Sequence, residues 1–227
     1  MTLLKYLKKD FAIELRDRSY ITSIFTLLLM VAVMITLGTH LAIIPHASLA
    51  RILPTFTWVS FILVQTITIN RSFIGEFELG AIESLAASEG NLRNFYQSKS
   101  IINSLIGIIA FIFFIICLSL LLPAEAARVG VYSSASILSL MIAIVAYSSL
   151  ATVLIPISIT SSLKDVLMAI LLIPLSFPIF FAAIEICTSA ATGIPLEWDS
   201  PWISLLLLIC AIYIPLGSVL FEYTVKQ

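Results

Sequence analysis

The sequence predicts an all-α integral membrane protein with six transmembrane helices. Hydrophobic residues make up 60% of the 227 positions and charged residues only 11%, whereas soluble domains are about 25% charged. Six long stretches carry no charge at all, and each can supply the roughly 20 residues that a helix needs to cross a bilayer core. Because lipid cannot hydrogen-bond the backbone, and because the alternating pattern of a membrane barrel is missing, these stretches are predicted to be helices.

Residues 1–20 precede the first span and are predicted to form an amphipathic helix at the membrane surface. Leu3, Leu7, Phe11 and Leu15 recur at every fourth position, while the lysines occupy other faces. This pattern is typical of a helix that lies in the membrane interface, with its lysines near anionic headgroups.

The six predicted spans belong to a single membrane domain, residues 1–227. They cover about 21–44, 48–70, 101–122, 134–157, 166–187 and 203–221. Pro174 and Pro178 lie in the fifth span, where we expect a bent or broken helix because proline removes an intrahelical hydrogen bond. The stretch from Phe180 to Trp202 mixes apolar and small polar residues, and we expect re-entrant helices there that enter the outer leaflet without crossing it.

The positively charged residues predict how the spans are oriented. With the N-terminus in the cytoplasm, the lysines and arginines fall almost entirely on the cytoplasmic side, and only Arg51 and Arg128 lie outside. Cytoplasmic loops of membrane proteins carry such an excess. Both termini are therefore predicted to be cytoplasmic.

No motif for catalysis or nucleotide binding occurs in the sequence. GxxxxGK[ST], HExxH and GxSxG are all missing, so the chain cannot hold ATP phosphates in a P-loop. The three cysteines lie within predicted spans without CxxC spacing and are expected to be buried apolar residues rather than metal ligands. We expect a non-catalytic subunit with no nucleic-acid partner, whose energy source, if it needs one, is another subunit.

Four residues toward the outer side are candidates for a functional role. His40 and His46 flank the turn after the first span, and neutral imidazole is a common ligand for iron or zinc. Glu185 is the acidic residue placed within a predicted span, and Arg51 lies at the start of the second span. Ionisable groups in the membrane are functional candidates because burial is costly, although each of these could also be a polar group that reaches out of the membrane.

The polar segment between the second and third spans, Arg71 to Leu85, is the best clue to function. After two glutamates it continues with Gly80, which allows a sharp turn, and with Ile82, Leu85 and Ala86 at helical spacing. The spacing predicts a short amphipathic helix with an apolar face. Such a helix can dock into a groove on a soluble partner or lie in the membrane interface.

This segment resembles the cytoplasmic coupling segment of ABC-2-type transporter permeases. In addition, Leu49-Ala-Arg51-Ile-Leu-Pro54 followed by Trp58-Val59, and Glu14-Leu-Arg16 in the first helix, are similar to the cytochrome c maturation protein B family, also called heme exporter protein B. The resemblance covers essentially the whole chain and is most specific over residues 51–85. The sequence departs from related loops where it continues Ala86-Ala-Ser-Glu-Gly90, instead of running into a Leu-Pro-rich stretch.

The resemblance implies a permease subunit of an ABC-type complex for c-type cytochrome maturation, in the bacterial cytoplasmic (inner) membrane. The implied partners are a CcmA-like ATPase, a CcmC-like heme-handling protein, a small CcmD-like subunit, a CcmE-like heme chaperone and a second copy in a homodimer. ATP hydrolysis by the ATPase would drive release of the heme-loaded chaperone, with heme handled by the partners and no cofactor bound directly. The implied ATPase contacts are Arg71, Phe73, Glu76, Gly80, Ile82, Glu83 and Leu85.

Two alternatives stay open at this point. An ABC-2 permease that exports a lipid or drug-like substrate would show substrate-stimulated ATPase activity in its complex. A passive scaffold that binds heme through His40 or His46 would show a heme absorbance band that is lost on replacing those residues.

Overall fold

The computed structural model describes residues 3–41, 46–78, 80, 92–122, 134–159, 164–194 and 196–225. Within these ranges the chain forms seven α-helices and no strand. Six of the helices are long and apolar enough to cross a membrane, which confirms the predicted number of spans. The helices are α1 (Leu3–Arg16), α2 (Arg18–Leu41), α3 (His46–Glu78), α5 (Leu92–Leu121), α6 (Ser134–Ile159), α7 (Lys164–Ala191) and α8 (Pro201–Val225).

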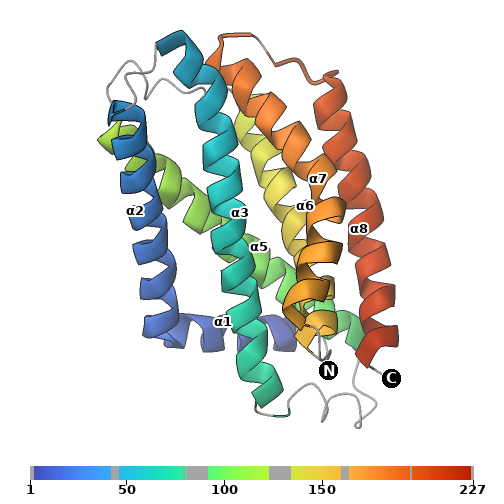
Figure 1. Cartoon of the computed structure of the whole chain (residues 1–227). Helices are drawn as coiled ribbons and strands as arrows, with labels where there is room; N and C mark the ends of the chain where they lie inside the picture. Colours follow the sequence, from blue (N-terminus) through green and yellow to red (C-terminus); the bar gives the residue numbers. More distant parts are fainter. Residues whose placement is uncertain are drawn as a thin grey trace.

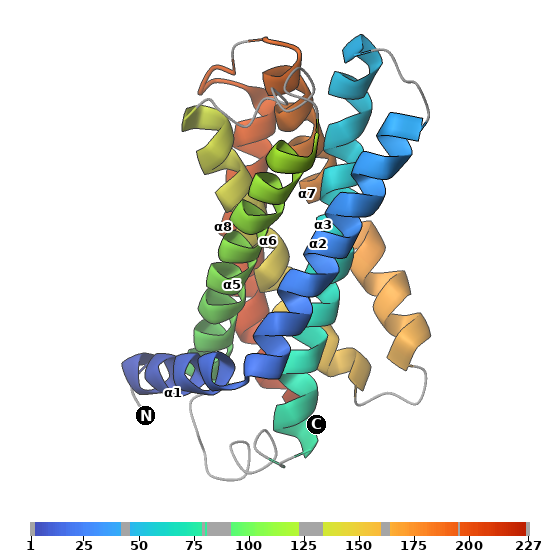
Figure 2. The ribbon, with the colours of Figure 1, turned by 90° about the vertical axis from the view of Figure 1, so that its left-hand side faces the viewer.

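The six long helices form one bundle, and α1 lies across one end of it (Figures 1 and 2). Both termini lie at this same end of the molecule (Figure 1). The turn from α1 into α2 is closed by Asp17, whose carboxylate accepts a hydrogen bond of 3.0 Å from the backbone N–H of Tyr20. An aspartate at this position caps the first turn of the helix that follows.

Two helices extend beyond the apolar stretches that predict them. α3 continues to Glu78, eight residues or about 12 Å past the predicted end of the second span, so the first half of the polar segment is helix. α5 begins at Leu92 rather than near residue 101. Both extensions lie at the α1 end of the bundle, and they bring polar residues of three helices together there.

The expected break in the fifth span and the re-entrant helices are not found. α7 is one helix with Pro174 and Pro178 inside it, and the described residues between α7 and α8 form turns. Carbonyl groups close to the prolines accept side-chain hydrogen bonds, at 2.8 Å from the Tyr213 hydroxyl and at 3.0 Å from that of Ser176. These are the carbonyls of Leu175 and Ile173, not those of Ile170 and Pro174 that lose an N–H partner to the two prolines.

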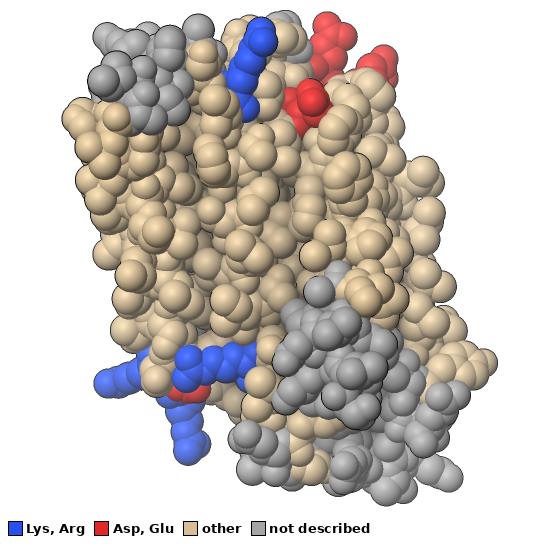
Figure 3. Space-filling view, in the orientation of Figure 1, with Lys and Arg blue, Asp and Glu red and all other residues tan. Residues whose placement is uncertain are grey.

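α6 forms the centre of the bundle and α2 its edge. In the spanning part of α6, 72% of the residues are buried, compared with 17% in α2. Met30, Met34 and Leu37 of α2 are exposed, as expected for side chains that face lipid rather than water. Figure 3 shows a broad uncharged surface between two ends that carry the visible charges.

A line of polar side chains joins α3, α5 and α6 inside the bundle. Gln65 donates hydrogen bonds through Nε2 to the Asn103 carbonyl (3.0 Å) and to the Ser148 hydroxyl (3.4 Å). The Asn103 amide in turn donates to the Thr152 hydroxyl at 3.1 Å. Side-chain hydrogen bonds between membrane helices hold neighbours in register.

We expect Gln65→Leu to lower the free energy of unfolding by about 1 kcal/mol, since such bonds average about 0.6 kcal/mol each. Thermal unfolding of the purified chain in mild detergent measures the change. Thr36→Val is the matched control, because the Thr36 hydroxyl donates only to the carbonyl of Ala32 in its own helix, at 2.8 Å. Equal midpoints for the two variants would contradict the expectation.

Two glycines allow helices to approach closely. A Cβ at Gly107 would lie 2.6 Å from Nε2 of Gln65, and one at Gly217 would lie 2.2 Å from the hydroxyl oxygen of Tyr96. Any larger residue at either position therefore requires the neighbouring helix or side chain to move.

Candidate functional site

Four charged side chains are buried where α1, α3 and α5 meet. Asp10 and Glu14 come from α1, Glu76 from α3 and Lys99 from α5, and none is more than 7% exposed. Asp10 and Glu14 are one helical turn apart, so they share one face of α1. We call these four residues the buried charge cluster.

Lys99 holds the cluster together. Its ammonium nitrogen lies 3.1 Å from Oε1 of Glu76 and 3.4 Å from Oε1 of Glu14. It also donates a hydrogen bond of 3.1 Å to the Ser72 hydroxyl, which donates in turn to Glu14. The Phe73 ring covers the ammonium group, 5.8 Å from the ring centre. One side chain of α5 thus binds both α1 and α3.

The remaining acid of the cluster is held separately. Asp10 accepts a hydrogen bond of 2.5 Å from the Ser98 hydroxyl. Lys9, which is 44% exposed at its side chain, lies 3.6 Å from both Asp10 and Glu76. Two lysines therefore face three carboxylates, and Oε2 of Glu76 has no hydrogen-bond partner in the described part of the chain.

The energetic meaning of the cluster follows from its burial. A buried ion pair is only weakly stabilising overall, but removing one partner typically costs about 3–5 kcal/mol because the other charge is left uncompensated. The three helices that carry these charges can therefore shift relative to one another only slightly before an ion pair is broken. The cluster sets how α1 and the ends of α3 and α5 lie against each other.

α1 turns its polar side toward the protein. Tyr6, Asp10 and Glu14 are buried against the bundle, whereas Leu4 and Phe11 are 63% and 45% exposed. A soluble amphipathic helix does the reverse and buries its apolar side. The exposed apolar side of α1 is the side that would contact lipid.

The structure separates the residues predicted to contact an ATPase. Phe73 and Glu76 are buried in the last turns of α3, while Arg71 is exposed. Gly80 follows in a turn with φ of 63°, a backbone conformation that favours glycine. Ile82, Glu83 and Leu85 lie outside the described residues.

Of the predicted site residues, the structure brings Phe73 and Glu76 together with residues that the sequence analysis did not assign to a site. These are Asp10, Glu14 and Lys99. Two signals in the sequence could have identified them, namely carboxylates four positions apart on an amphipathic helix and a lysine just before a long apolar stretch.

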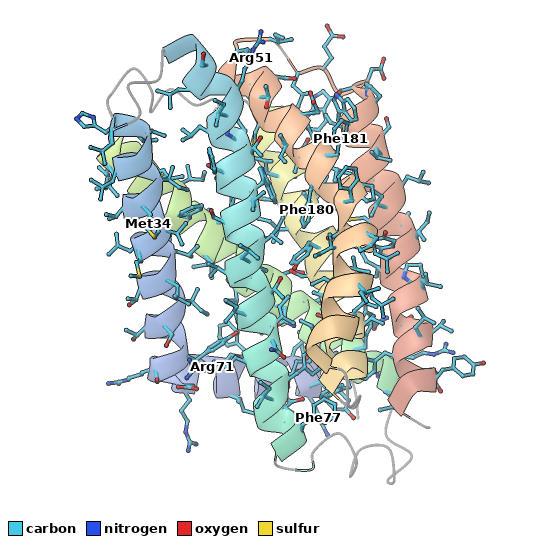
Figure 4. The ribbon with its side chains drawn as sticks, in the orientation of Figure 1. Met34, Arg51, Arg71, Phe77, Phe180 and Phe181 are labelled. Carbon is cyan, nitrogen blue, oxygen red and sulfur yellow. The ribbon has the colours of Figure 1, made fainter. Side chains whose placement is uncertain are left out.

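The four outer candidates lie away from the cluster. Figure 4 places Arg51 at the opposite end of the bundle from Arg71. Arg51 and His40 are exposed and Glu185 is half-buried, while His46 begins α3 with a side chain outside the description. The described residues include no group of three His, Cys, Asp or Glu side chains that could hold a metal ion. A role for these four residues stays a prediction from sequence.

Six helices that are long and apolar enough to cross a membrane fit a multi-pass membrane transport permease subunit. A model of the CcmB protein family matches residues 1–223. The chain therefore belongs to this family, the heme exporter protein B family of cytochrome c biogenesis. Membership implies a Ccm heme exporter complex with ATPase partners. No curated protein matches the sequence.

Proposed function

We propose that this subunit carries the movement of a partner ATPase into the membrane bundle and thereby releases a heme-loaded chaperone at the outer face. The segment after α3, with Gly80, Ile82, Glu83 and Leu85, contacts the ATPase. The observation that carries the proposal is the pairing of Lys99 with both Glu76 and Glu14, at the point where α3 leaves the bundle.

The geometry explains how a push on this segment would be transmitted. Glu76 is one helical turn before Gly80, and both Phe73 and Glu76 are buried. A displacement of the α3 end either separates Glu76 from Lys99, now 3.1 Å apart, or moves α5 with it. Because separation leaves buried charges uncompensated, α1 and the ends of α3 and α5 are expected to move as one body.

Packing farther along the bundle supplies a route toward the outer end. The Trp58 indole N–H of α3 donates to the Cys187 sulfur of α7 at 3.2 Å, and its ring lies 5.2 Å from that of Phe111 on α5. Tilting α3 and α5 therefore shifts α7, which carries Glu185 near the outer end. Rigid, close-packed contacts of this kind pass displacement on rather than absorb it.

The proposal includes a complex of defined composition. A homodimer in the bacterial cytoplasmic (inner) membrane, with both termini in the cytoplasm, engages two CcmA-like ATPase subunits. CcmC-like and CcmD-like membrane subunits and a CcmE-like chaperone bind toward the outer side. Heme stays with these partners, and this subunit binds no cofactor itself.

Charge reversal in the coupling segment tests the proposal. We expect Glu83→Arg or Leu85→Arg to lower recovery of the ATPase with the tagged subunit by about tenfold, since each buries an unpaired charge at a contact. Chaperone release with ATP should fall to the same extent, while the amount of membrane-inserted subunit stays unchanged. Quantitative mass spectrometry of the mild-detergent pull-down measures recovery.

Glu197→Arg is the matched control, because Glu197 is an exposed glutamate in the connection from α7 to α8. This connection lies at the end of the bundle opposite α1 (Figure 1). It should leave ATPase recovery at the wild-type level. Normal chaperone release by the Glu83 and Leu85 variants would remove the basis for a coupling segment.

A further inference from the structure

A shallow polar groove lies between α2 and α3 and includes Arg71, which was predicted from sequence as an ATPase contact. Arg18, Ser19, Thr22 and Thr26 of α2 line it, together with Arg71 of α3. Its volume is about 670 Å³. The groove lies at the α1 end of the bundle, where Figure 4 shows Arg71 between the ribbons of α2 and α3.

Arg71 is held in place by contacts with α2, and both arginines of the groove lack an ion-pair partner among the described residues. The Arg71 guanidinium donates a hydrogen bond of 3.2 Å to the Ser23 hydroxyl and lies 5.9 Å from the centre of the Tyr20 ring. None of the ion pairs among the described residues involves Arg18 or Arg71. Asp17, the nearest acid in sequence, uses one carboxylate oxygen to cap α2. The groove therefore presents two positive charges to one ligand.

The groove also changes character along its length. Arg18 is the first residue of α2, and Leu27, which lines the other end of the groove, lies about 13 Å farther along the helix axis. Exposed hydroxyl groups of Thr22 and Thr26 lie between them. A ligand that fits this order is anionic at one end, accepts hydrogen bonds in the middle and is apolar at the other end.

We propose that the groove binds the headgroup of an anionic phospholipid. The phosphate group lies between the guanidinium groups of Arg18 and Arg71, because guanidinium groups bind phosphate through paired hydrogen bonds. The ester carbonyls face the threonine hydroxyls, and the first part of an acyl chain lies along Leu27. Basic pockets between membrane helices at the cytoplasmic side bind lipid headgroups by this chemistry.

A lipid bound here has a structural consequence. α2 is the least buried of the six spans, and at this end it contacts α3 through the Tyr20 hydroxyl, which donates to the Thr68 carbonyl at 3.2 Å, and through Ser23. A phosphate group shared by Arg18 and Arg71 connects the start of α2 to the exposed part of α3. The lipid thus adds a further link between the two helices beside these contacts.

Native mass spectrometry of the purified full-length chain tests the site, with phosphatidylglycerol and phosphatidylcholine titrated separately in detergent. We expect tighter binding of the first phosphatidylglycerol, and a loss of about fivefold in its affinity for each arginine replaced in R18Q and R71Q. R18K/R71K keeps both charges and should retain affinity within about threefold of wild type. Size-exclusion profiles confirm that each variant remains folded.

K8Q is the matched control, because Lys8 is exposed on α1 and its loss removes one positive charge outside the groove. The proposal is overturned if R18Q/R71Q loses no more affinity than K8Q does. It is also overturned if millimolar inorganic phosphate displaces phosphatidylglycerol, which would make the groove a site for a free anion. Unchanged lipid binding together with loss of ATPase recovery in R71Q would assign the arginines to a protein contact instead.

Discussion

Replacing Lys99 with methionine is expected to lower the free energy of unfolding by about 3–5 kcal/mol. Methionine fills a similar volume, so the main loss is electrostatic. Of the two buried glutamates, Glu76 is then left with Lys9, which lies 3.6 Å away and is 44% exposed, and Glu14 is left with the Ser72 hydroxyl. Chemical unfolding of the purified chain in mild detergent, followed by circular dichroism, measures the change.

The charge argument can be separated from packing by a triple variant. K99M/E14Q/E76Q removes the stranded charges, and we expect it to regain most of the lost stability, since neutral replacement of a buried ion pair is often tolerated. Lys8→Met, at an exposed position of α1, should change stability by less than about 0.5 kcal/mol. A Lys99 variant as stable as the Lys8 variant would mean that the cluster does not hold these helices together.

The second large effect is expected at Gly217 of α8. A Cβ there would lie 2.2 Å from the Tyr96 hydroxyl oxygen and 2.9 Å from a methyl group of Val153. Alanine in place of glycine within a helix normally stabilises by about 0.5–1 kcal/mol. Overpacking costs about 1–3 kcal/mol, which exceeds the gain in helix propensity. Gly217→Ala should therefore lower the free energy of unfolding. Gly217→Leu should prevent α8 from packing at all.

Gly38 supplies a control of opposite sign. A Cβ at Gly38 meets nothing within 4 Å, so Gly38→Ala in α2 should raise the unfolding midpoint. Tyr96→Phe should restore part of the stability of Gly217→Ala, because the hydroxyl is the nearest clashing group, although its hydrogen bond of 3.1 Å to the Ser149 carbonyl is lost. Equal effects at Gly217 and Gly38 would contradict the close approach of α5 and α8.

The number and type of helices could be predicted from composition, because every span must be long enough to cross the bilayer and must satisfy its backbone hydrogen bonds internally. The residues at which the helices end could not be predicted in this way. Hydropathy ends the second span near Asn70, whereas α3 continues to Glu78, since the helix persists wherever neighbours can pair its polar side chains. The re-entrant helices are not found, because α7 continues as one helix to Ala191 and the described residues after it form turns.

The candidate site was only partly accessible from sequence. Glu76 and Phe73 were assigned to the coupling segment by resemblance, but their burial depends on α1 and α5, which are distant in the chain. Lys99 counted only as one more cytoplasmic charge, and nothing local distinguishes it from exposed Lys8. Pairing between helices is a property of the tertiary structure, and no periodicity within one helix reveals it.

The inward-facing acids of α1 have a consequence for how the chain is made. Asp10 and Glu14 are synthesised well before their partners, because the ammonium group of Lys99 that faces Glu14 and the hydroxyl of Ser98 that binds Asp10 are nearly ninety residues later. Until α5 has been synthesised, Glu14 has the Ser72 hydroxyl of α3 as a partner but lacks the ammonium group of Lys99, and Asp10 lacks the hydroxyl of Ser98. The polar side of α1 is therefore fully paired only once the third span is in place.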